Sequence, residues 1–522
     1  MKLSGIKLFL LACFLALAAF AGYLPDLKDY GPTWDEFFHR PTGKQYLDYF
    51  RTGNKEKILS LQKASWLPPV ASILGQIFIE NIALNKIYPM ETDRFHLAAV
   101  FYASVIVATV FLITFLVLGN IWLSLGAAML LFFHPQFAVQ AHTNVRDMGL
   151  VMFFTLTIFS LMLSVRNRGG SLIWAALSGL LTGLALDSKQ NGIYLLFIAL
   201  IWLFVNKKIL GKRLLPAIIL YLFTAAISFF IFWPYLWFDT LNHLQLAWEY
   251  LRSESIMAGS LTFYGQTYYS MRNIPFYYPF VMLFIVTQPL ISGAAVIGLY
   301  GSFRGLKGKP KEGMLFLWLF IPLIRYYIPS TAISHDQIRH FLEVLPAVPI
   351  LACLTLSNLY KFAQTYKLKY LTVSTHILIA VMILYNAYLY FAYRPYGSAY
   401  FNFLAGSPDY VTQSFDVEYW GNVYREATKY LNNQYGQKKT FLMPGLGTHL
   451  LLENGFKGKI TEDFNSEYDY VIFMNKRNWI NDRPYLIWLL SNKKPIFTIS
   501  RGGKILFYQF KPYKEDYIQR GG

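Results

Sequence analysis

The chain is a series of long apolar runs separated by short polar or charged segments. Runs long enough to cross a hydrocarbon core of about 30 Å predict about eleven membrane-spanning helices. They cover residues 5–24, 95–118, 121–140, 148–165, 171–187, 191–206, 214–234, 275–303, 313–329, 340–359 and 371–393. The pattern therefore predicts a polytopic α-helical membrane protein and excludes a single anchor on a globular body.

Basic residues collect in alternate loops between these runs. If the N-terminus is inside, the positive-inside rule places these loops in the cytoplasm. The loops carry Arg166 and Arg168; Lys207, Lys208, Lys212 and Arg213; Arg304, Lys307, Lys309 and Lys311; and Lys361, Lys367 and Lys369. Residues 25–94, 141–147, 235–274 and everything after about 394 then lie outside, so we expect an integral protein of the cytoplasmic membrane.

The first run can be interpreted in two ways. Lys2 and Lys7 precede an apolar stretch that ends in Ala19-Phe20-Ala21, which also satisfies the small-x-small signature of a cleaved signal peptide. We favour a retained anchor, and either interpretation leaves residue 25 onward outside. A further apolar stretch begins at Leu67-Pro68-Pro69, but a span there would invert every later loop. We expect juxtamembrane helices within 25–94 instead.

The pattern changes after about residue 395, where charged residues become frequent. Short β-rich runs occur at 439–443, 468–474 and 495–510, and the last contains Arg501-Gly502-Gly503-Lys504, a turn signal that predicts a β-hairpin. The sequence therefore predicts two domains. We expect residues 1–394 to form a transmembrane domain and residues 395–522 to form a small external α/β domain.

The composition agrees with a membrane protein. Hydrophobic residues make up 55% of the 522 residues and charged residues only 15%, below the quarter usual in soluble domains. The net charge of +18 fits nucleic acid or cytoplasmic membrane faces, and its position in alternate loops favours the membrane. Cys13 and Cys353 both lie inside apolar runs and are too few for a disulfide framework or a thiolate zinc site.

Acids and bases at the ends of apolar runs are costly and so indicate function. Trp34-Asp35-Glu36 follows the first run. Adjacent acids on a loop point in different directions, so one can face a reaction centre while the other makes a structural hydrogen bond. A solvated loop or a helix cap is the alternative interpretation.

Three more clusters lie on the same predicted side. His142, Asn144, Arg146 and Asp147 offer cation, acid and neutral donors in one turn, which suits phosphate or divalent-metal binding, although Asp147 could simply cap a helix. Lys189 is a cation on the outside, suited to a lipid phosphate or to pairing with Asp187. Arg339 and His340 follow Asp336, and the Arg339 guanidinium fits either a phosphate or Asp336.

Taken together, these clusters resemble the polyprenyl-phosphate-dependent glycosyltransferases of the GT-C type, specifically relatives of glycosyltransferase family 39, which includes the dolichyl-phosphate-mannose protein mannosyltransferases. Trp34-Asp35-Glu36 matches the acidic pair of their first external loop. His134-Pro135-Gln136-Phe137-Ala138 through Asn144-Val145-Arg146-Asp147 resembles a longer motif, from which Gln136, Val145 and Arg146 depart. Lys189-Gln190-Asn191-Gly192, Asp336-Gln337-Ile338-Arg339-His340 and Glu418-Tyr419-Trp420-Gly421 resemble further motifs, and Gln337 replaces a glycine.

The resemblance implies a site, a fold and a reaction. The fold is a GT-C bundle with juxtamembrane helices, and the reaction moves a sugar from a polyprenyl-phosphate donor to a protein, lipid or glycan acceptor at the outer face. It implies Asp35 as the general base with Glu36 beside it, and no cofactor. Family 39 members generally need no metal, so we expect none, although oligosaccharyltransferase relatives use external acids to hold a divalent cation. The position of the charges predicts no nucleic-acid partner. The residues that would bind the donor are His142, Asn144, Arg146, Asp147, Lys189, Arg339 and His340.

Three other classes of protein stay open at this point. A lipid-linked-sugar transporter or flippase would show repeated halves and charges at the membrane midplane, whereas here the charges cluster at outer ends. A nonenzymatic subunit of an envelope complex would tolerate loss of Asp35. An oligosaccharyltransferase or lipid A-modifying transferase is the third class, and the Trp-Trp-Asp type motif of oligosaccharyltransferases is not evident around Trp420.

Overall fold

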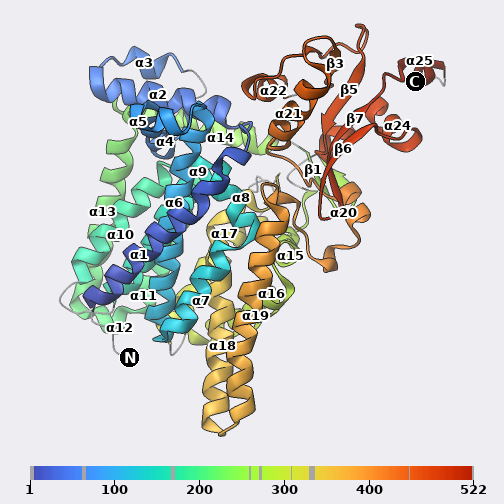
Figure 1. Ribbon diagram of the computed structural model, residues 1–522. Coiled ribbons are helices and arrows are strands. Elements are labelled where there is room, and N and C mark those ends of the chain that lie inside the picture. The colour runs from blue at the N-terminus through green and yellow to red at the C-terminus, as the bar shows by residue number, and fades with distance from the viewer. Residues whose placement is uncertain are drawn as a thin grey trace.

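The computed structural model describes residues 5–61, 66–165, 171–257, 260–269, 273–306, 309–327, 336–445 and 447–519. Arg166, Arg168 and Lys307 of the predicted cytoplasmic loops lie outside these residues. The chain folds into a bundle of apolar helices with a β-sheet unit at one end (Figure 1). The N-terminal helix α1 (Gly5–Tyr23) begins at the end of the bundle away from the sheet.

The described residues contain five helical stretches that are long and apolar enough to cross a membrane alone. Two bent helix pairs raise the number to seven. The single stretches are Gly5–Asp29, Glu91–Leu118, Val145–Ser164, Lys207–Phe232 and Lys369–Tyr393, and the pairs are Ile121–Phe132 with Pro135–Thr143 and Gln337–Val344 with Ala347–Thr365. Each predicted run contains at least one helix, but the predicted number of about eleven spans is not confirmed.

The remaining bundle helices are shorter because polar turns and prolines end them early. Pro135 begins α8 directly after His134, and this break bends α7 against α8 by 63°. The bundle consists of α1, α6 (Glu91–Leu118), α7 (Ile121–Phe132), α8 (Pro135–Thr143), α9 (Val145–Ser164), α10 (Ser171–Leu186), α11 (Tyr194–Val205), α12 (Lys207–Leu210), α13 (Leu214–Phe232), α15 (Tyr278–Ile285), α16 (Pro289–Gly305), α17 (Pro310–Leu323), the 3-10 segment η8 (Gln337–Val344), α18 (Ala347–Thr365) and α19 (Lys369–Tyr393).

Small residues let α10 and α13 approach closely. A Cβ on Gly179 would lie 2.1 Å from the Tyr221 carbonyl oxygen, and one on Gly183 would lie 2.7 Å from the Ala225 carbonyl oxygen. Glycines at such contacts are typical of helix pairs in membranes, where close backbone packing replaces the hydrophobic effect. The opposite side of α13 leaves apolar side chains such as Leu215 and Phe223 exposed, as a lipid-facing surface requires.

Short helices cover the end of the bundle that carries the sheet (Figure 1). They are α2 (Glu36–Thr52), α3 (Glu56–Leu59), α4 (Val70–Glu80), α5 (Ile82–Ile87) and α14 (Thr240–Met257). Four of these five lie in the segment 25–94, so the prediction of helices in place of a simple loop is confirmed. Their position at a membrane interface stays a prediction.

The C-terminal part forms a five-stranded sheet of order β4-β3-β5-β7-β6. Its strands are β3 (Thr440–Leu442), β4 (Lys459–Thr461), β5 (Tyr470–Met474), β6 (Phe497–Arg501) and β7 (Lys504–Phe510). Strand β3 pairs parallel with β4 and β5, whereas β7 pairs antiparallel with β5 and β6. Helices α20 (Pro408–Ser414), α21 (Val423–Tyr435), α22 (Thr448–Glu453), α23 (Arg477–Asn481), α24 (Pro484–Asn492) and α25 (Lys514–Gln519) accompany the sheet, and β1 (Leu261–Phe263) with β2 (Gln266–Tyr268) forms a separate hairpin.

The predicted hairpin at Arg501–Lys504 is confirmed. Gly502 and Gly503 have φ angles of 55° and 75°, the left-handed values that a two-residue turn of this kind needs and that glycine adopts without strain. The short strand β4 was not expected from the sequence. The division of the chain at residue 394 into two domains stays a prediction.

Candidate active site

Asp35 and Glu36 point to different surroundings at the start of α2. The Asp35 Oδ2 atom accepts a hydrogen bond from Nη2 of Arg339 at 2.6 Å, across 304 positions in the chain. The Asp35 side chain is 30% exposed, so one face of the carboxylate is open to an incoming molecule. An acid that is both exposed and fixed by a buried cation can accept a proton in a defined position.

Glu36 is buried and surrounded by donors. Its Oε1 atom accepts hydrogen bonds from the Thr33 backbone N–H at 2.8 Å and the Thr33 hydroxyl at 3.1 Å, and lies 2.7 Å from His96 Nε2. Its Oε2 atom accepts a hydrogen bond from the Thr92 hydroxyl at 3.2 Å. Burial raises the pKa of Glu36, but His96, Arg40 and Thr33 outweigh burial, so the pKa lies below its usual value. These contacts tie α2 to α6.

Asp147 is held at the N-terminus of α9 by Asn144 and Lys189. The Asp147 backbone N–H donates to Asn144 Oδ1 at 3.0 Å, and Asn144 Nδ2 donates to Asp147 Oδ2 at 2.8 Å. The Lys189 ammonium donates to Asp147 Oδ1 at 2.7 Å, and only 3% of the Lys189 side chain is exposed. Burial lowers the pKa of Lys189 below its usual value, and Asp147 opposes that change.

Arg339 lies at the centre of a cluster of charged side chains that consists of Asp35, Asp147, Asp336, Lys189, Arg339 and Lys476. Its guanidinium donates to Asp35 at 2.6 Å and to Asp336 at 3.0 Å, and its Nε lies 3.8 Å from Asp147 Oδ2. The guanidinium also stacks over the Trp420 ring at 4.6 Å from its centroid. Asp35, Asp147 and Arg339, which the sequence places in three separate segments, are therefore in one contact network.

The C-terminal part supplies a cation that sequence reasoning missed. Lys476 follows β5, and its ammonium lies 2.8 Å from Asp336 Oδ1 and 4.4 Å from the centroid of the Trp479 ring. Both the Lys476 and Asp336 side chains are less than a tenth exposed. No sequence signal marks Lys476, because only the docking of the sheet onto the bundle brings it to the site.

The backbone before Arg339 has an uncommon conformation. Asp336 and Gln337 have φ angles of 56° and 58°, a left-handed region that side chains other than glycine rarely adopt. Gln337 Nε2 donates to the carbonyl oxygens of Ser398 at 3.0 Å and Asp416 at 2.7 Å. Gln136 Nε2 donates to Gln337 Oε1 at 2.9 Å. These hydrogen bonds hold the strained segment in place.

Gln136 and Gln337 are also two positions at which this sequence departs from the motifs it resembles. A glycine at 337 would adopt the positive φ without strain. Here a glutamine occupies the position, and its side chain bonds to the second substituted residue. The two residues that differ from the family motifs, Gln136 and Gln337, therefore contact each other and are not two unrelated substitutions.

His142 faces the interior of the bundle. Its Nδ1 lies 2.7 Å from the Ala138 carbonyl oxygen and its Nε2 lies 3.0 Å from the Tyr23 carbonyl oxygen. The ring stacks on Tyr30 with centroids 4.2 Å apart. The described contacts of His142 therefore join α8 to the end of α1, and they do not include Arg339.

Arg146 and His340 also make contacts beside the cluster. Arg146 donates to the Ser188 carbonyl oxygen at 3.3 Å and to Gln190 Oε1 at 3.2 Å, next to Lys189 in the chain. The His340 carbonyl oxygen accepts a hydrogen bond from Asn191 Nδ2 at 2.8 Å. Arg146 thus holds the turn that carries Lys189, and the His340 backbone is tied to the same turn.

His39 is a second residue that sequence reasoning missed. It is buried and lies one helical turn after Asp35 on α2. Burial lowers the pKa of His39 to about 4, and the charge of Arg146 adds to this effect while Asp35 opposes it. The imidazole is therefore neutral near pH 7. The four-residue spacing from Asp35 was the available signal.

The acids of the cluster are paired with cations. Lys189 contacts Asp147, Lys476 contacts Asp336, and Arg339 contacts Asp35. Over the part of the chain that the structure describes, no group of three or more His, Cys, Asp or Glu side chains could hold a metal ion. The expectation of a metal-independent reaction stays a prediction.

Residues 84–238 match the family model of the dolichyl-phosphate-mannose-protein mannosyltransferases. Among solved structures, ArnT from Cupriavidus metallidurans bound to undecaprenyl phosphate is similar at 12% identity and a TM-score of 0.49, covering 97% of this chain and 98% of that chain. The Archaeoglobus fulgidus oligosaccharyltransferase in the apo form is similar at 10% identity and a TM-score of 0.48, covering 88% of this chain and 70% of that chain.

No curated protein matches the chain. The matched segment contains Asn144, Asp147 and Lys189, and therefore the part of the cluster that α9 and the turn after α10 provide. The match over residues 84–238 confirms the resemblance indicated by the motifs and connects this segment to the dolichyl-phosphate-mannose-protein mannosyltransferase family.

Proposed function

We propose that this protein is a membrane-embedded inverting glycosyltransferase that moves a sugar from a polyprenyl-phosphate donor to an acceptor hydroxyl. The observation that carries the proposal is the contact at 2.6 Å between the partly exposed Asp35 carboxylate and the buried Arg339 guanidinium. It combines an acid able to take a proton with a cation able to hold a phosphate. The match of residues 84–238 to a mannosyltransferase family supports the same reaction class.

The charges of the cluster explain how a donor would bind. Three cations, Lys189, Arg339 and Lys476, pair with three acids, Asp35, Asp147 and Asp336. A donor phosphate that contacts Arg339 would compete with Asp35 for the guanidinium. Binding would therefore release the Asp35 carboxylate for the acceptor while the phosphate takes its place.

The reaction then follows from these two roles. Asp35 takes the proton of the acceptor hydroxyl as its oxygen bonds to the anomeric carbon, and the bond from that carbon to the phosphate oxygen breaks. The polyprenyl phosphate leaves with one more negative charge than it carried in the donor. Arg339 and Lys189 lie where that charge develops and stabilise it. Attack opposite the leaving phosphate inverts the anomeric configuration.

Transfer in proteoliposomes tests the proposal. Purified protein would be reconstituted with a panel of radiolabelled polyprenyl-phosphate sugars and with protein, lipid and glycan acceptors. We expect one donor to be used, the product to have the inverted anomeric configuration, and a nucleotide-linked form of the same sugar to give no product. Transport of an intact lipid-linked sugar without transfer would contradict the proposal and support the flippase class.

We propose further that the Asp35 end of the bundle faces the outside of the cytoplasmic membrane. Lys207 and Lys208 on α12, with Lys212 and Arg213 after it, lie at the opposite end from α2 (Figure 1). Such an excess of basic residues is typical of a cytoplasmic face. Labelling of single cysteines at residue 208 and at residue 438 with an impermeant reagent on intact cells tests this orientation.

Replacing Lys476 with methionine tests whether the C-terminal part positions the cluster. The change removes the cation beside Asp336, so Asp336 competes more strongly for Arg339 and the guanidinium moves off Asp35. We expect kcat for transfer to fall by about tenfold, in the range of one displaced charge-assisted contact, with little change in KM for the donor. Lys476→Arg should restore most of the rate.

Lys493→Met is a matched control for this variant. Lys493 also pairs with an aspartate, Asp516 at 2.5 Å, and lies over the Trp488 ring, but it is remote from the cluster. We expect wild-type kcat for it. Equal losses in both variants, with equal shifts of the unfolding temperature, would show that Lys476 only stabilises the C-terminal part.

Replacing Glu36 with glutamine tests the role of the second acid. Because Glu36 accepts hydrogen bonds from Thr33, Thr92 and His96 away from Arg339, we expect a loss of stability by about 1–3 kcal/mol, the cost of broken buried hydrogen bonds. Thermal unfolding in detergent measures this loss. Transfer per folded molecule should stay within a few-fold of wild type, and a loss of activity at unchanged unfolding temperature would instead assign Glu36 to the chemistry.

A further inference from the structure

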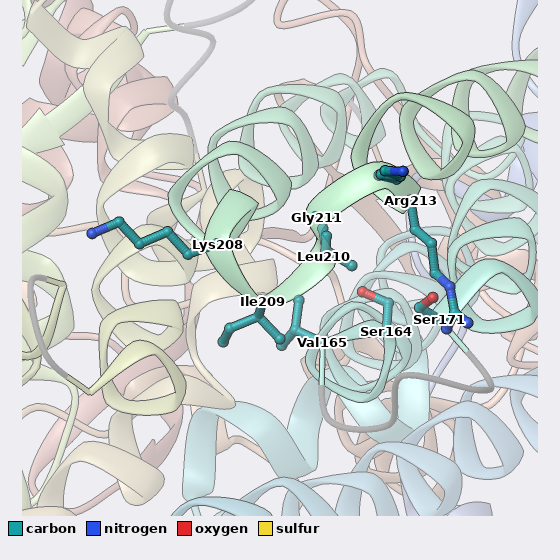
Figure 2. Close-up of a pocket in the computed structure, with 9 residues that line it drawn as sticks. Ser164, Val165, Ser171, Lys208, Ile209, Leu210, Gly211 and Arg213 are labelled. Carbon is teal, nitrogen blue, oxygen red and sulfur yellow. The ribbon is translucent and has the colours of Figure 1, made fainter.

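A pocket of about 330 Å³ is lined by residues of α12, at the end of the bundle opposite α2 (Figure 1). It is formed where α9 ends, α10 begins and the chain turns from α12 into α13 (Figure 2). Its lining residues are Ser164, Val165, Ser171, Lys208, Ile209, Leu210, Gly211, Lys212 and Arg213. The volume is in the range that holds a small ligand or a lipid headgroup.

The lining is basic and contains no acid. Lys208, Lys212 and Arg213 are three of its nine residues, and across the residues that the structure describes no ion pair joins any of them to a carboxylate. Figure 2 shows the Arg213 side chain reaching down beside Ser171, whereas Lys208 extends outward along the rim. The pocket therefore places the Arg213 guanidinium beside Ser171, with Lys208 and Lys212 also in its lining, and such a group of cations suits a phosphate.

Apolar side chains continue from the pocket along the bundle. Phe204 and Val205 at the end of α11 are 60% and 43% exposed, and Leu215 and Ile219 on α13 are 65% and 58% exposed. These surfaces flank the basic turn on both sides. A ligand with a phosphate in the pocket and hydrocarbon chains along α11 and α13 would fit both the basic pocket and the apolar surfaces beside it.

We propose that this pocket binds the phosphate of an anionic membrane phospholipid. A choline headgroup would bring a quaternary ammonium close to the basic residues of the pocket, whereas the glycerol headgroup of phosphatidylglycerol carries no positive charge. The pocket includes α12, which lies at the opposite end of the bundle from α2 and its N-cap residue Asp35, so the proposal does not depend on the donor site or on the transferase reaction. Inorganic phosphate is the other source of the same chemistry.

Native mass spectrometry of the purified full-length protein tests the proposal. Delipidated protein would be titrated with phosphatidylglycerol and, separately, with phosphatidylcholine, and bound lipids counted. We expect wild type to retain phosphatidylglycerol about tenfold better than phosphatidylcholine, and the triple variant Lys208→Ala, Lys212→Ala, Arg213→Ala to lose that preference, as expected for removal of three cations near a membrane surface.

The matched control removes three other basic residues at the same end of the bundle. Lys361, Lys367 and Lys369 lie at the exposed junction of α18 and α19, so their replacement with alanine changes the net charge equally. We expect this control to retain phosphatidylglycerol like wild type. An equal loss in control and pocket variants, or no preference in wild type, would show attraction by net charge alone and overturn the proposal.

Two further measurements distinguish binding of free phosphate from binding of a lipid, and cover the case in which the triple variant does not fold. Millimolar inorganic phosphate that raises the unfolding temperature of wild type but not of the pocket variant, while phosphatidylglycerol is not retained, would assign the pocket to free phosphate and overturn the lipid. If the triple variant fails to fold, Arg213→Gln and Arg213→Lys replace it. We expect the first to weaken phosphatidylglycerol retention several-fold and the second to preserve it, because lysine keeps the charge.

Discussion

Replacing Asp35 with asparagine is expected to lower the transfer rate by about 10²- to 10⁴-fold, the usual contribution of a positioned general base. An amide has the size of the carboxylate but cannot take a proton from the acceptor hydroxyl. The change also frees the Arg339 guanidinium from its contact at 2.6 Å. KM for the donor should therefore stay the same or fall, since a donor phosphate no longer competes with an acid for that cation.

Initial rates of radiolabelled sugar transfer in proteoliposomes measure both effects, with protein amounts compared by blot. Asp48→Asn is the matched control because Asp48 lies on the same helix, α2, away from Arg339, and it should transfer at the wild-type rate. If Asp35→Asn retains full activity, the base is elsewhere. Asp147 and Glu36 would then be the candidates, and Asp147 is already occupied by Lys189 and Asn144.

The sequence could place the acids and cations of the cluster because each lies at the end of an apolar run. Asp35, Asp147, Lys189 and Arg339 come from four segments far apart in the chain, and only the alternation of spans puts their ends at one face. The structure brings all four into one network at that end. The motifs and the basic loops therefore contain enough information to locate this network.

The alternation of spans does not predict the direction in which a side chain points. His142 and His340 lie near the cluster in sequence, yet the His142 ring stacks on Tyr30, and the hydrogen bond between His340 and Asn191 uses the His340 carbonyl oxygen. Which way a residue faces depends on the rotation of its helix about its axis. That rotation is set by packing against other helices, which an apolar run does not encode residue by residue.

The pattern of apolar positions also does not determine the number of membrane spans. Such a pattern gives the length of a run but not the bends inside it, and α7 turns by 63° into α8 at Pro135. Similarly, η8 bends by 56° into α18. The docking of the C-terminal sheet is a tertiary feature, so Lys476 and the stacking of Trp420 on Arg339 had no local signal.

Replacing Arg339 with glutamine is expected to have the second large effect. The guanidinium contacts three carboxylates and would be the main partner of the donor phosphate in the proposed reaction. Loss of one preorganised group that stabilises developing charge lowers rates by about 10²- to 10³-fold. Stability should fall as well, because Asp35, Asp147 and Asp336 are left close together without their shared cation.

The two effects can be separated by measurement. Arg339→Lys keeps the charge but replaces the two nitrogens that separately contact Asp336 and Asp35 with one ammonium, so we expect an intermediate transfer rate and an unfolding temperature near that of wild type. Arg394→Gln is the matched control, since Arg394 pairs with Asp26 at 2.5 Å outside the cluster. It should lower stability slightly and leave the transfer rate per folded molecule unchanged.

An unfolding temperature that falls in Arg339→Gln without a change in transfer per folded molecule would overturn the donor site. The cluster would then serve only to join the bundle to the C-terminal part through Lys476 and Trp420. The opposite result is a much lower transfer rate in a stable protein, with a raised KM for the donor. It would require a substrate that contacts Arg339 directly. Because the guanidinium is 9% exposed and enclosed by acids, that substrate must carry negative charge able to displace Asp35.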